Sequence, residues 1–331
     1  MPFFDSLRAA LSRYSNYVHT VGKQASPAQL TKAAERLGFP LPPAHLDFLQ
    51  SWNGATLFHE AFELFAADKL QRTGPTHEYI YIGDSPDGAL WEKADGRVYL
   101  VDGESPDPIL CGSDLEHYVT VLVAREALVM DREGEFRDVF SEEGELNESV
   151  RLKRALAGQK HDAKAALYWF EHAELLCEEG DPTEACALLK KAVGLDGQAG
   201  PAWELLSALL KQDGQPEGAE HAAVQGALAT WDPFVRASRY LDAAQLMPTR
   251  ATEHAQAANA ADPDHAKQLV EEAKQLLAEG HVDEAERLAT RLRLFLSPRS
   301  EASASHDSKP ATSELQNLER ELRTRHALRV M

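Results

Sequence analysis

Apolar residues recur with helical spacing at the start of the chain and again throughout its C-terminal half. Residues 3–18 place apolar side chains three and four positions apart, which predicts a first helix. A second helix is expected to open at Ser26, a capping residue followed by Pro27 at the first helical position, and to stop at Gly38. A third helix is expected over residues 42–52.

The pattern then changes to short apolar runs separated by turn residues. Strands are predicted at residues 62–65, 79–82, 89–91 and 98–101. Residues 83–88 read as a turn, and Asp95-Gly96 as a hairpin turn.

Two further segments complete the N-terminal half. Residues 115–129 predict a packing helix after Asp114, with a strand as the alternative because the valines at 119, 121 and 123 alternate. Residues 131–150 are charged and punctuated by glycine, which indicates a hairpin tip or a linker.

The C-terminal half repeats itself at an interval of 34 residues. Trp169 and Trp203 show this interval, and so do Gly180 and Gly214, Pro182 and Pro216, and Ala185 and Ala219. A fixed period near 34 is typical of stacked helical hairpins, in which each unit buries its apolar face against its neighbours. Such arrays offer a groove to other proteins, so the repeat favours recognition over catalysis.

These repeats resemble the tetratricopeptide repeat over residues 162–298. About four hairpins are expected, the third with a degenerate first helix, and small residues allow the paired helices to approach closely. The structural positions are Trp169, Gly180, Ala185, Trp203, Gly214, Ala219, Gly280 and Ala285. Residues 299–312 read as a polar low-complexity linker, and residues 313–331 as a last helix opened by a capping box at Ser313 and Gln316.

The N-terminal motifs together resemble the SUKH superfamily, which includes bacterial toxin-immunity proteins and the yeast cell-wall synthesis regulator. The residues that carry the resemblance are Leu37-Gly38-Phe39-Pro40-Leu41-Pro42, Phe48-Leu49, Trp52-Asn53-Gly54, Ile82-Gly83-Asp84-Ser85 and Asp87-Gly88. The match implies an α+β domain over residues 1–150, with helices packed on a mainly antiparallel sheet. The repeats that follow it imply an all-α helical-hairpin solenoid. Gly38, Trp52, Asn53, Gly54 and Gly83 are interpreted as scaffold residues.

Negative charge is concentrated in one part of the chain. The net charge is −19, and residues 83–148 hold eighteen acidic against five basic residues. This excess repels phosphate, so nucleic acid is not an expected partner. It attracts cationic proteins, and the candidate partner-binding residues are Asp84, Asp87, Glu92, Asp95, Asp102, Glu104 and Asp107. A merely solubilising surface is the alternative.

The sequence contains no constellation that indicates catalysis, a cofactor or a metal. His59-Glu60 lacks the second histidine of a zinc-protease helix, and the glycine after Asp131 comes too early for a calcium loop. No run approaches 18 apolar residues and no signal peptide is evident, so we expect a soluble, cytoplasmic protein without membrane contact.

The function that the sequence favours is therefore protein binding without catalysis. The SUKH resemblance implies an immunity protein that binds and neutralises a bacterial toxin domain, with the repeats making a further protein contact. The alternative is a scaffold or regulatory adaptor that has no toxin partner.

Overall fold

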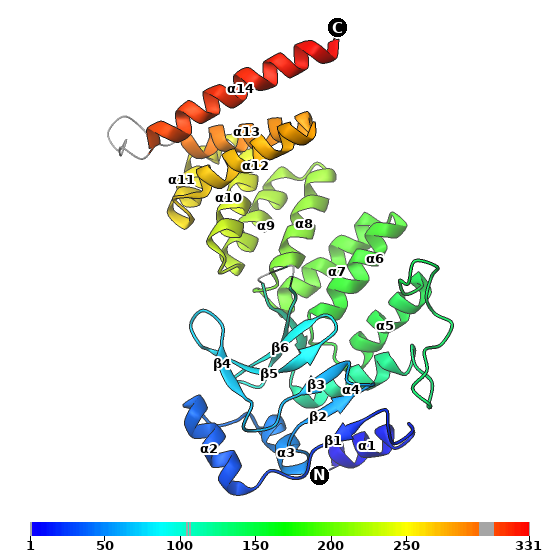
Figure 1. Ribbon diagram of the computed structural model, residues 1–331. Helices are drawn as coiled ribbons and strands as arrows, with labels where there is room; N and C mark the ends of the chain where they lie inside the picture. Colours follow the sequence, from blue (N-terminus) through cyan, green and yellow to red (C-terminus); the bar gives the residue numbers. More distant parts are fainter. Residues whose placement is uncertain (1, 104, 106, 298–307, 331) are drawn as a thin grey trace. The chain divides into compact units, whose positions relative to one another are not determined.

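The computed structural model describes residues 2–103, 105, 107–297 and 308–330. It divides into two compact units, Met1–Ala202 and Trp203–Met331, which are taken in turn (Figure 1). The sequence places a domain boundary earlier, between residues 150 and 162, and that boundary stays a prediction.

The helices of the first unit begin where local capping is strongest. Ser26 accepts a hydrogen bond from the backbone N–H of Gln29, and the Gln29 side chain accepts one from the backbone of Ser26. This reciprocal cap satisfies two amides that would otherwise lack partners. The helices are α1 (Pro2–Leu11), α2 (Pro27–Leu37), α3 (Pro43–Ser51), α4 (Leu115–Glu126), α5 (Glu148–His161), α6 (Leu167–Glu179) and α7 (Pro182–Leu195).

Three helical predictions change in detail. The first helix ends at Leu11 instead of residue 18, because the chain turns there and the Ser15 amide donates to the Arg132 carbonyl. The segment after Asp114 is a helix, and the alternative of a strand is wrong. Within residues 131–150 the chain makes two tight turns closed by isolated bridges, and α5 has already begun by residue 148.

The strands form one antiparallel sheet in the order β1-β2-β3-β5-β6-β7-β8, with β4 pairing with β5. Their bounds are β1 (Thr20–Val21), β2 (Ala55–Leu57), β3 (Phe62–Leu64), β4 (Gln71–Thr73), β5 (Tyr79–Ser85), β6 (Gly88–Lys93), β7 (Val98–Val101) and β8 (Ile109–Gly112). The predicted turn at residues 83–88 is wrong, because β5 continues through Ser85 and only residues 86–87 turn. A Cβ at Gly83 would lie 1.9 Å from the Glu63 carbonyl oxygen, so the close pairing of β3 with β5 requires glycine.

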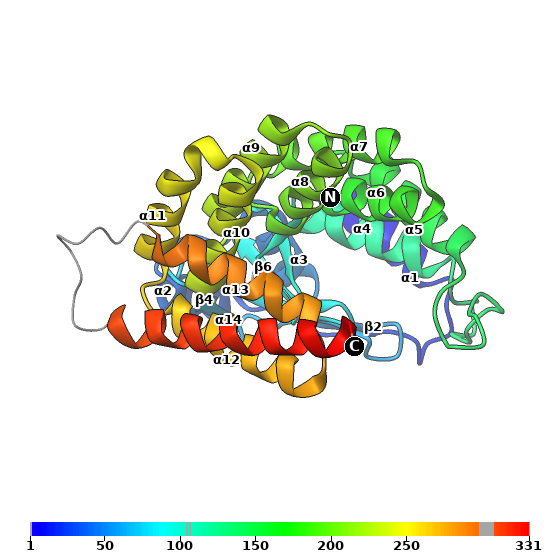
Figure 2. The same ribbon diagram turned by 90° about the horizontal axis from the view of Figure 1, so that it is seen from above.

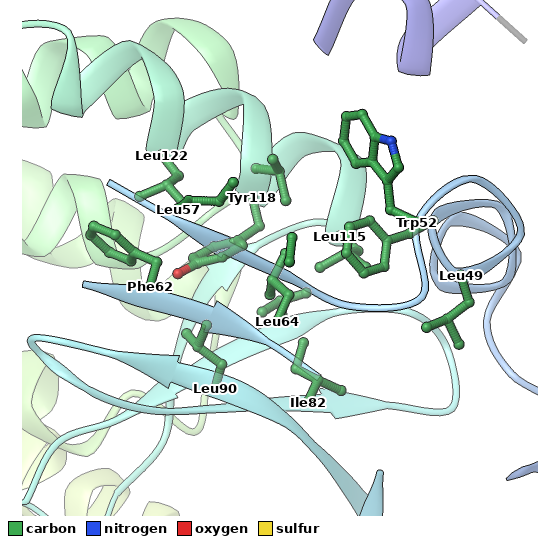
Figure 3. Packing of buried hydrophobic residues seen from close by; sticks show 14 of the residues in the cluster. Leu49, Trp52, Leu57, Phe62, Leu64, Ile82, Leu90, Leu115, Tyr118 and Leu122 are labelled. Atoms are coloured by element: carbon green, nitrogen blue, oxygen red, sulfur yellow. The ribbon is translucent and has the colours of Figure 1, made fainter. Parts of the chain in front are cut away.

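The core of the first unit lies between the sheet and helices α3 and α4 (Figure 3). Leu64, Ile82 and Leu90 point from three strands toward Leu115 and Tyr118 of α4. All five side chains are buried. Their burial orients the sheet, and therefore decides which positions of each strand reach solvent.

Strand β8 lies at the end of the sheet, and its outer edge is covered by side chains from α6 and from the turns that follow α5 and α7. Tyr168 Oη donates to the Cys111 carbonyl oxygen at 2.7 Å. Asp196 Oδ2 accepts from the Leu110 amide at 3.0 Å, and Asp162 Oδ2 accepts from the Ser113 amide at 2.6 Å. An exposed edge strand invites pairing with another chain, and these contacts prevent it.

The second unit is built from helical hairpins. Its helices are α8 (Gly200–Gln212, which begins at the end of the first unit), α9 (Pro216–Ala229), α10 (Pro233–Leu246), α11 (Ala251–Ala261), α12 (His265–Glu279), α13 (Val282–Leu296) and α14 (Ser308–Val330), with a short 3₁₀ helix at Pro248–Arg250. Gly214 and Gly280 have positive φ where α8 and α12 end. The third hairpin lacks such a glycine and turns through the 3₁₀ helix, although its first helix is complete.

The last helix packs against the hairpin before it. Leu315, Leu318 and Leu322 are buried with residues of α12 and α13, and Figures 1 and 2 show α14 beside these helices. The predicted start at Ser313 is wrong, because α14 begins at Ser308. Most of the predicted linker, residues 299–307, lies outside the described residues.

Candidate functional site

The acidic residues predicted to bind a partner do not form one patch. In an antiparallel meander successive turns lie at opposite ends of the sheet. Asp87 lies in the β5–β6 turn and Asp102 follows β7 at the same end, whereas Asp95 lies in the β6–β7 turn at the other end. Asp95 also pairs with Arg97 at 2.8 Å. The sheet topology therefore divides the set.

Glu92 is not a surface residue, which corrects the expectation that it contacts a partner. It follows Leu90 by two positions on β6, so both side chains point into the core, and Glu92 is 0% exposed. Its Oε2 lies 2.5 Å from His45 Nδ1. Burial raises the pKa of Glu92, and the neighbouring His45 opposes that shift. The two-residue spacing between Leu90 and Glu92 along the strand is the sequence feature that indicates burial of Glu92.

The remaining predicted acids differ in their surroundings. Asp107 is buried as well, at 2% exposure. Asp84 accepts a hydrogen bond from Tyr81 Oη at 2.5 Å. Burial, together with this hydrogen bond, raises the pKa of Tyr81 to about 12. Glu104 lies outside the described residues.

The residues predicted to be structural occupy positions that shape the scaffold. Gly38 and Gly180 end α2 and α6 in the left-handed conformation, and Gly54 also has positive φ. Trp52 is buried, and Asn53 Oδ1 accepts from the Ala67 amide at 2.8 Å. Ala185, Ala219 and Ala285 are fully buried where paired helices meet. Trp169 and Trp203 are half-buried.

A groove in the second unit is a candidate binding site. It has a volume of about 210 Å³ and lies between α8, α9 and α10. Its floor consists of Ala222, Ala223 and Gly226, whose small side chains leave the space open. A Cβ at Gly226 would lie 3.2 Å from that of Trp203, so a larger residue would disturb the floor.

Charged side chains of both signs surround this groove. Arg239 Nη2 lies 3.1 Å from Glu204 Oε2, and its Nη1 donates to the Gly226 carbonyl. Asp242 pairs with Arg291 at 3.0 Å, and burial raises the pKa of Asp242 while Arg291 opposes the shift. These groups were missed at the sequence level because they come from α8, α10 and α13, and only the fold brings them together.

The other sequence motifs have structural roles. His59 Nε2 lies 3.1 Å from the Gly134 carbonyl oxygen, and Asp131 Oδ1 accepts from the amides of Glu133 and Glu135. Within the described ranges, no group of three His, Cys, Asp or Glu side chains is arranged to hold a metal ion. None of the helices in that part of the chain is both long and apolar enough to cross a membrane.

No protein-family model matches the chain, and no curated protein matches it significantly. Solved structures similar to part of it include the MamA protein, at 14% identity and TM-score 0.31, covering 48% of this chain and 87% of that chain. YrrB, described as a TPR protein with an unusual peptide-binding site, is 14% identical at TM-score 0.28 and covers 52% and 97%. PilF of Pseudomonas aeruginosa is 14% identical at TM-score 0.32 and covers 62% and 81%.

At these identities and TM-scores the similarities define neither a family nor a ligand for this chain. The hairpin architecture rests on the helices of the structure itself, and the SUKH resemblance stays a prediction.

Proposed function

We propose that this protein binds other proteins without catalysing a reaction, and that the groove of the second unit holds a segment of its partner. The observation that carries the proposal is the groove between α8, α9 and α10, with its floor of small residues and its charged rim. A site of this kind recognises a side chain by shape and by polar contacts.

The rim suits a peptide segment that carries both polar and apolar groups. Arg239 is already paired with Glu204, whereas Lys211 is exposed and has no acidic partner within ion-pair distance among the described residues. Lys211 is therefore available to a carboxylate of the partner. The floor accepts a small apolar side chain beside it.

The test fills the groove from an exposed position. Ala208 lines the groove and is exposed, so Ala208→Arg should leave folding unchanged while it blocks entry. Glu217→Arg, on the exposed start of α9, is the control. A photo-crosslinking residue at position 245, an exposed glutamine that lines the groove and has no assigned contact with the partner, identifies the partner in cells of the source organism. The crosslink should disappear with Ala208→Arg and persist with Glu217→Arg; persistence with both would exclude the groove.

For the first unit, the SUKH resemblance supports a more specific proposal, in which a cytoplasmic immunity protein neutralises a toxin domain. The experiment is co-expression with a toxin encoded beside this gene, scored by growth. Protection by the full chain supports immunity. The absence of both protection and binding favours the alternative of a scaffold or adaptor.

A further inference from the structure

A second cleft lies within the first unit, between one end of the sheet and the helices that follow it. Its volume is about 350 Å³. The sheet contributes Asp87 and Asp102, and α6 contributes Phe170, Glu171 and Glu174. The cleft therefore brings the two predicted acids that share an end of the sheet together with two acids of α6.

The three arginines that line this cleft are already neutralised. Arg125 Nη2 lies 2.9 Å from Glu171 Oε1, and Arg154 Nη1 lies 2.9 Å from Glu126 Oε1. Arg151 donates both terminal nitrogens to Glu178, at 2.7 and 2.8 Å. Because each guanidinium has a carboxylate partner, the cleft offers little attraction to an anion.

Two carboxylates of the cleft lack a cationic partner. Asp87 is exposed, Glu174 is half-buried, and neither has a basic side chain within ion-pair distance among the described residues. Burial raises the pKa of Glu174 to about 7; the charge of Glu171 adds to the effect, and the charge of Arg151 opposes it without forming an ion pair. An incoming cation would relieve the cost of ionising this carboxyl.

Apolar side chains form the rest of the wall. Leu146, Leu167 and Phe170 are half-buried around the cleft. Such surfaces suit a cation carried on an aliphatic stem, whose methylene groups pack while a planar head stacks on an aromatic ring. A bare inorganic ion would gain nothing from them.

From this combination we propose that the cleft is a socket for an arginine side chain of a partner protein. The guanidinium would lie between Asp87 and Glu174, with its stem against the leucines and its face toward Phe170. This site is separate from the groove of the second unit, so either proposal can fail while the other holds.

The test uses the full-length protein and acetyl-arginine amide as the probe. Methyl NMR spectra should show saturable shifts at Leu146, Leu167 and Leu175, which line the cleft. Acetyl-citrulline amide has nearly the same shape without the charge, and it should bind at least about tenfold more weakly. Equal shifts with the two probes, or none up to about 50 mM, would overturn the proposal.

Variants locate the binding. Asp87→Asn combined with Glu174→Gln should weaken arginine binding by about tenfold or more. Binding is measured at pH 8, where Glu174 is mostly ionised. The control, Glu60→Gln with Glu179→Gln, then makes nearly the same change in net charge at exposed residues outside the cleft and should leave binding unchanged. An equal loss in both pairs would mean that only the overall charge matters. If the first pair fails to fold, the comparison of the two probes still decides the question.

Discussion

The same local turn occurs in both units, but in the first unit its side chain also binds backbone at the edge of the sheet. Asp162, Asp196, Thr230 and Asp262 each follow a helix, and the side chain of each accepts from the amide two residues later. The first three are spaced by 34 residues. In the first unit the other oxygen of Asp196 also accepts from Leu110 of β8, and that of Asp162 accepts from Ser113, the residue after β8.

This comparison shows how a repeated element becomes part of a different domain. Where the turn residue only accepts from the amide two residues later, a threonine hydroxyl is enough, as at position 230. A residue that must also satisfy a backbone amide of β8 needs two acceptor oxygens, which aspartate supplies. Because Asp162, in the turn after α5, belongs to this series, the repeat pattern begins with α5, one helix before α6, which carries Trp169.

The cores of the two units also differ, in the size of the side chains that fill them. The largest fully buried side chains of the described residues include Tyr79, Tyr99 and Phe58 of the first unit. Among these largest side chains, the second unit contributes Phe295 alone. The second unit is packed largely through alanine. Its stability thus depends on close helix approach, and that of the first on large side chains and buried polar contacts.

The largest effect is expected from removing the helices that close β8. A fragment of residues 1–150 should still unfold cooperatively, as the sequence predicts, but with about 3–5 kcal/mol less stability than residues 1–202. The reason is that Val121, now packed against Tyr168, becomes exposed and the β8 edge opens. Urea denaturation of both fragments measures the difference. Equal midpoints would show that α5–α7 contribute nothing, and an unfolded 1–150 would show that they belong to the same domain.

The next largest effect separates a buried acid from an exposed one. Glu92→Lys should cost about 3–5 kcal/mol, because it leaves an unpaired buried charge beside His45. Asp87→Lys, in the exposed turn, should cost less, about 1 kcal/mol, because the new charge repels nearby Arg125 across a solvated cleft. Denaturant midpoints at neutral pH test both. If Glu92→Lys leaves the denaturant midpoint unchanged, Glu92 is not buried and remains a candidate partner-binding residue.

Matched turn variants test the comparison directly. Asp196→Ala removes acceptors for two amides, those of Leu110 and Gln198, and should cost about 2–3 kcal/mol. Thr230→Ala removes one acceptor and should cost about 1 kcal/mol. Similar losses, measured by thermal and urea unfolding, would mean that the bond to β8 adds no stability.

The smallest expected effect depends on pH. The pKa of Glu174 is about 7 in the folded protein, above its ordinary value, so the folded state binds the proton more tightly than the unfolded state. Stability from this group is present at low pH and is lost as the pH rises through 7. Glu174→Gln should therefore stabilise the protein at pH 8 by about 1 kcal/mol, allowing for partial exposure, and by less at pH 5.

Glu178→Gln provides the control of opposite sign. Its hydrogen bond to Arg151 lowers the pKa of Glu178, so this carboxylate favours the folded state as the pH rises. The substitution should destabilise the protein slightly at pH 8. If the effect of Glu174→Gln does not change with pH, the carboxyl of Glu174 is not desolvated.

Local patterns predicted most of the helices and the best-formed strands. The cap at Ser26 and the left-handed end at Gly38 are decided by neighbouring residues, so the sequence shows them. Strands β1, β2, β4 and β8 were missed, and their shortness is not a sufficient reason, because β3 and β7 are equally short and were predicted. The start of α14 was missed because a capping motif at Ser313 lies inside a longer helix.

The sequence by itself determined the repeated hairpins, since a 34-residue period and small residues at fixed positions act through near neighbours. It also determined the acidic excess of residues 83–148. Only the tertiary structure decided where that charge lies: Glu92 in the core, Asp95 at one end of the sheet, and Asp87 in a cleft that Glu174 also lines. These positions depend on strand register and on helices distant in the chain, and no local pattern encodes a contact of that range.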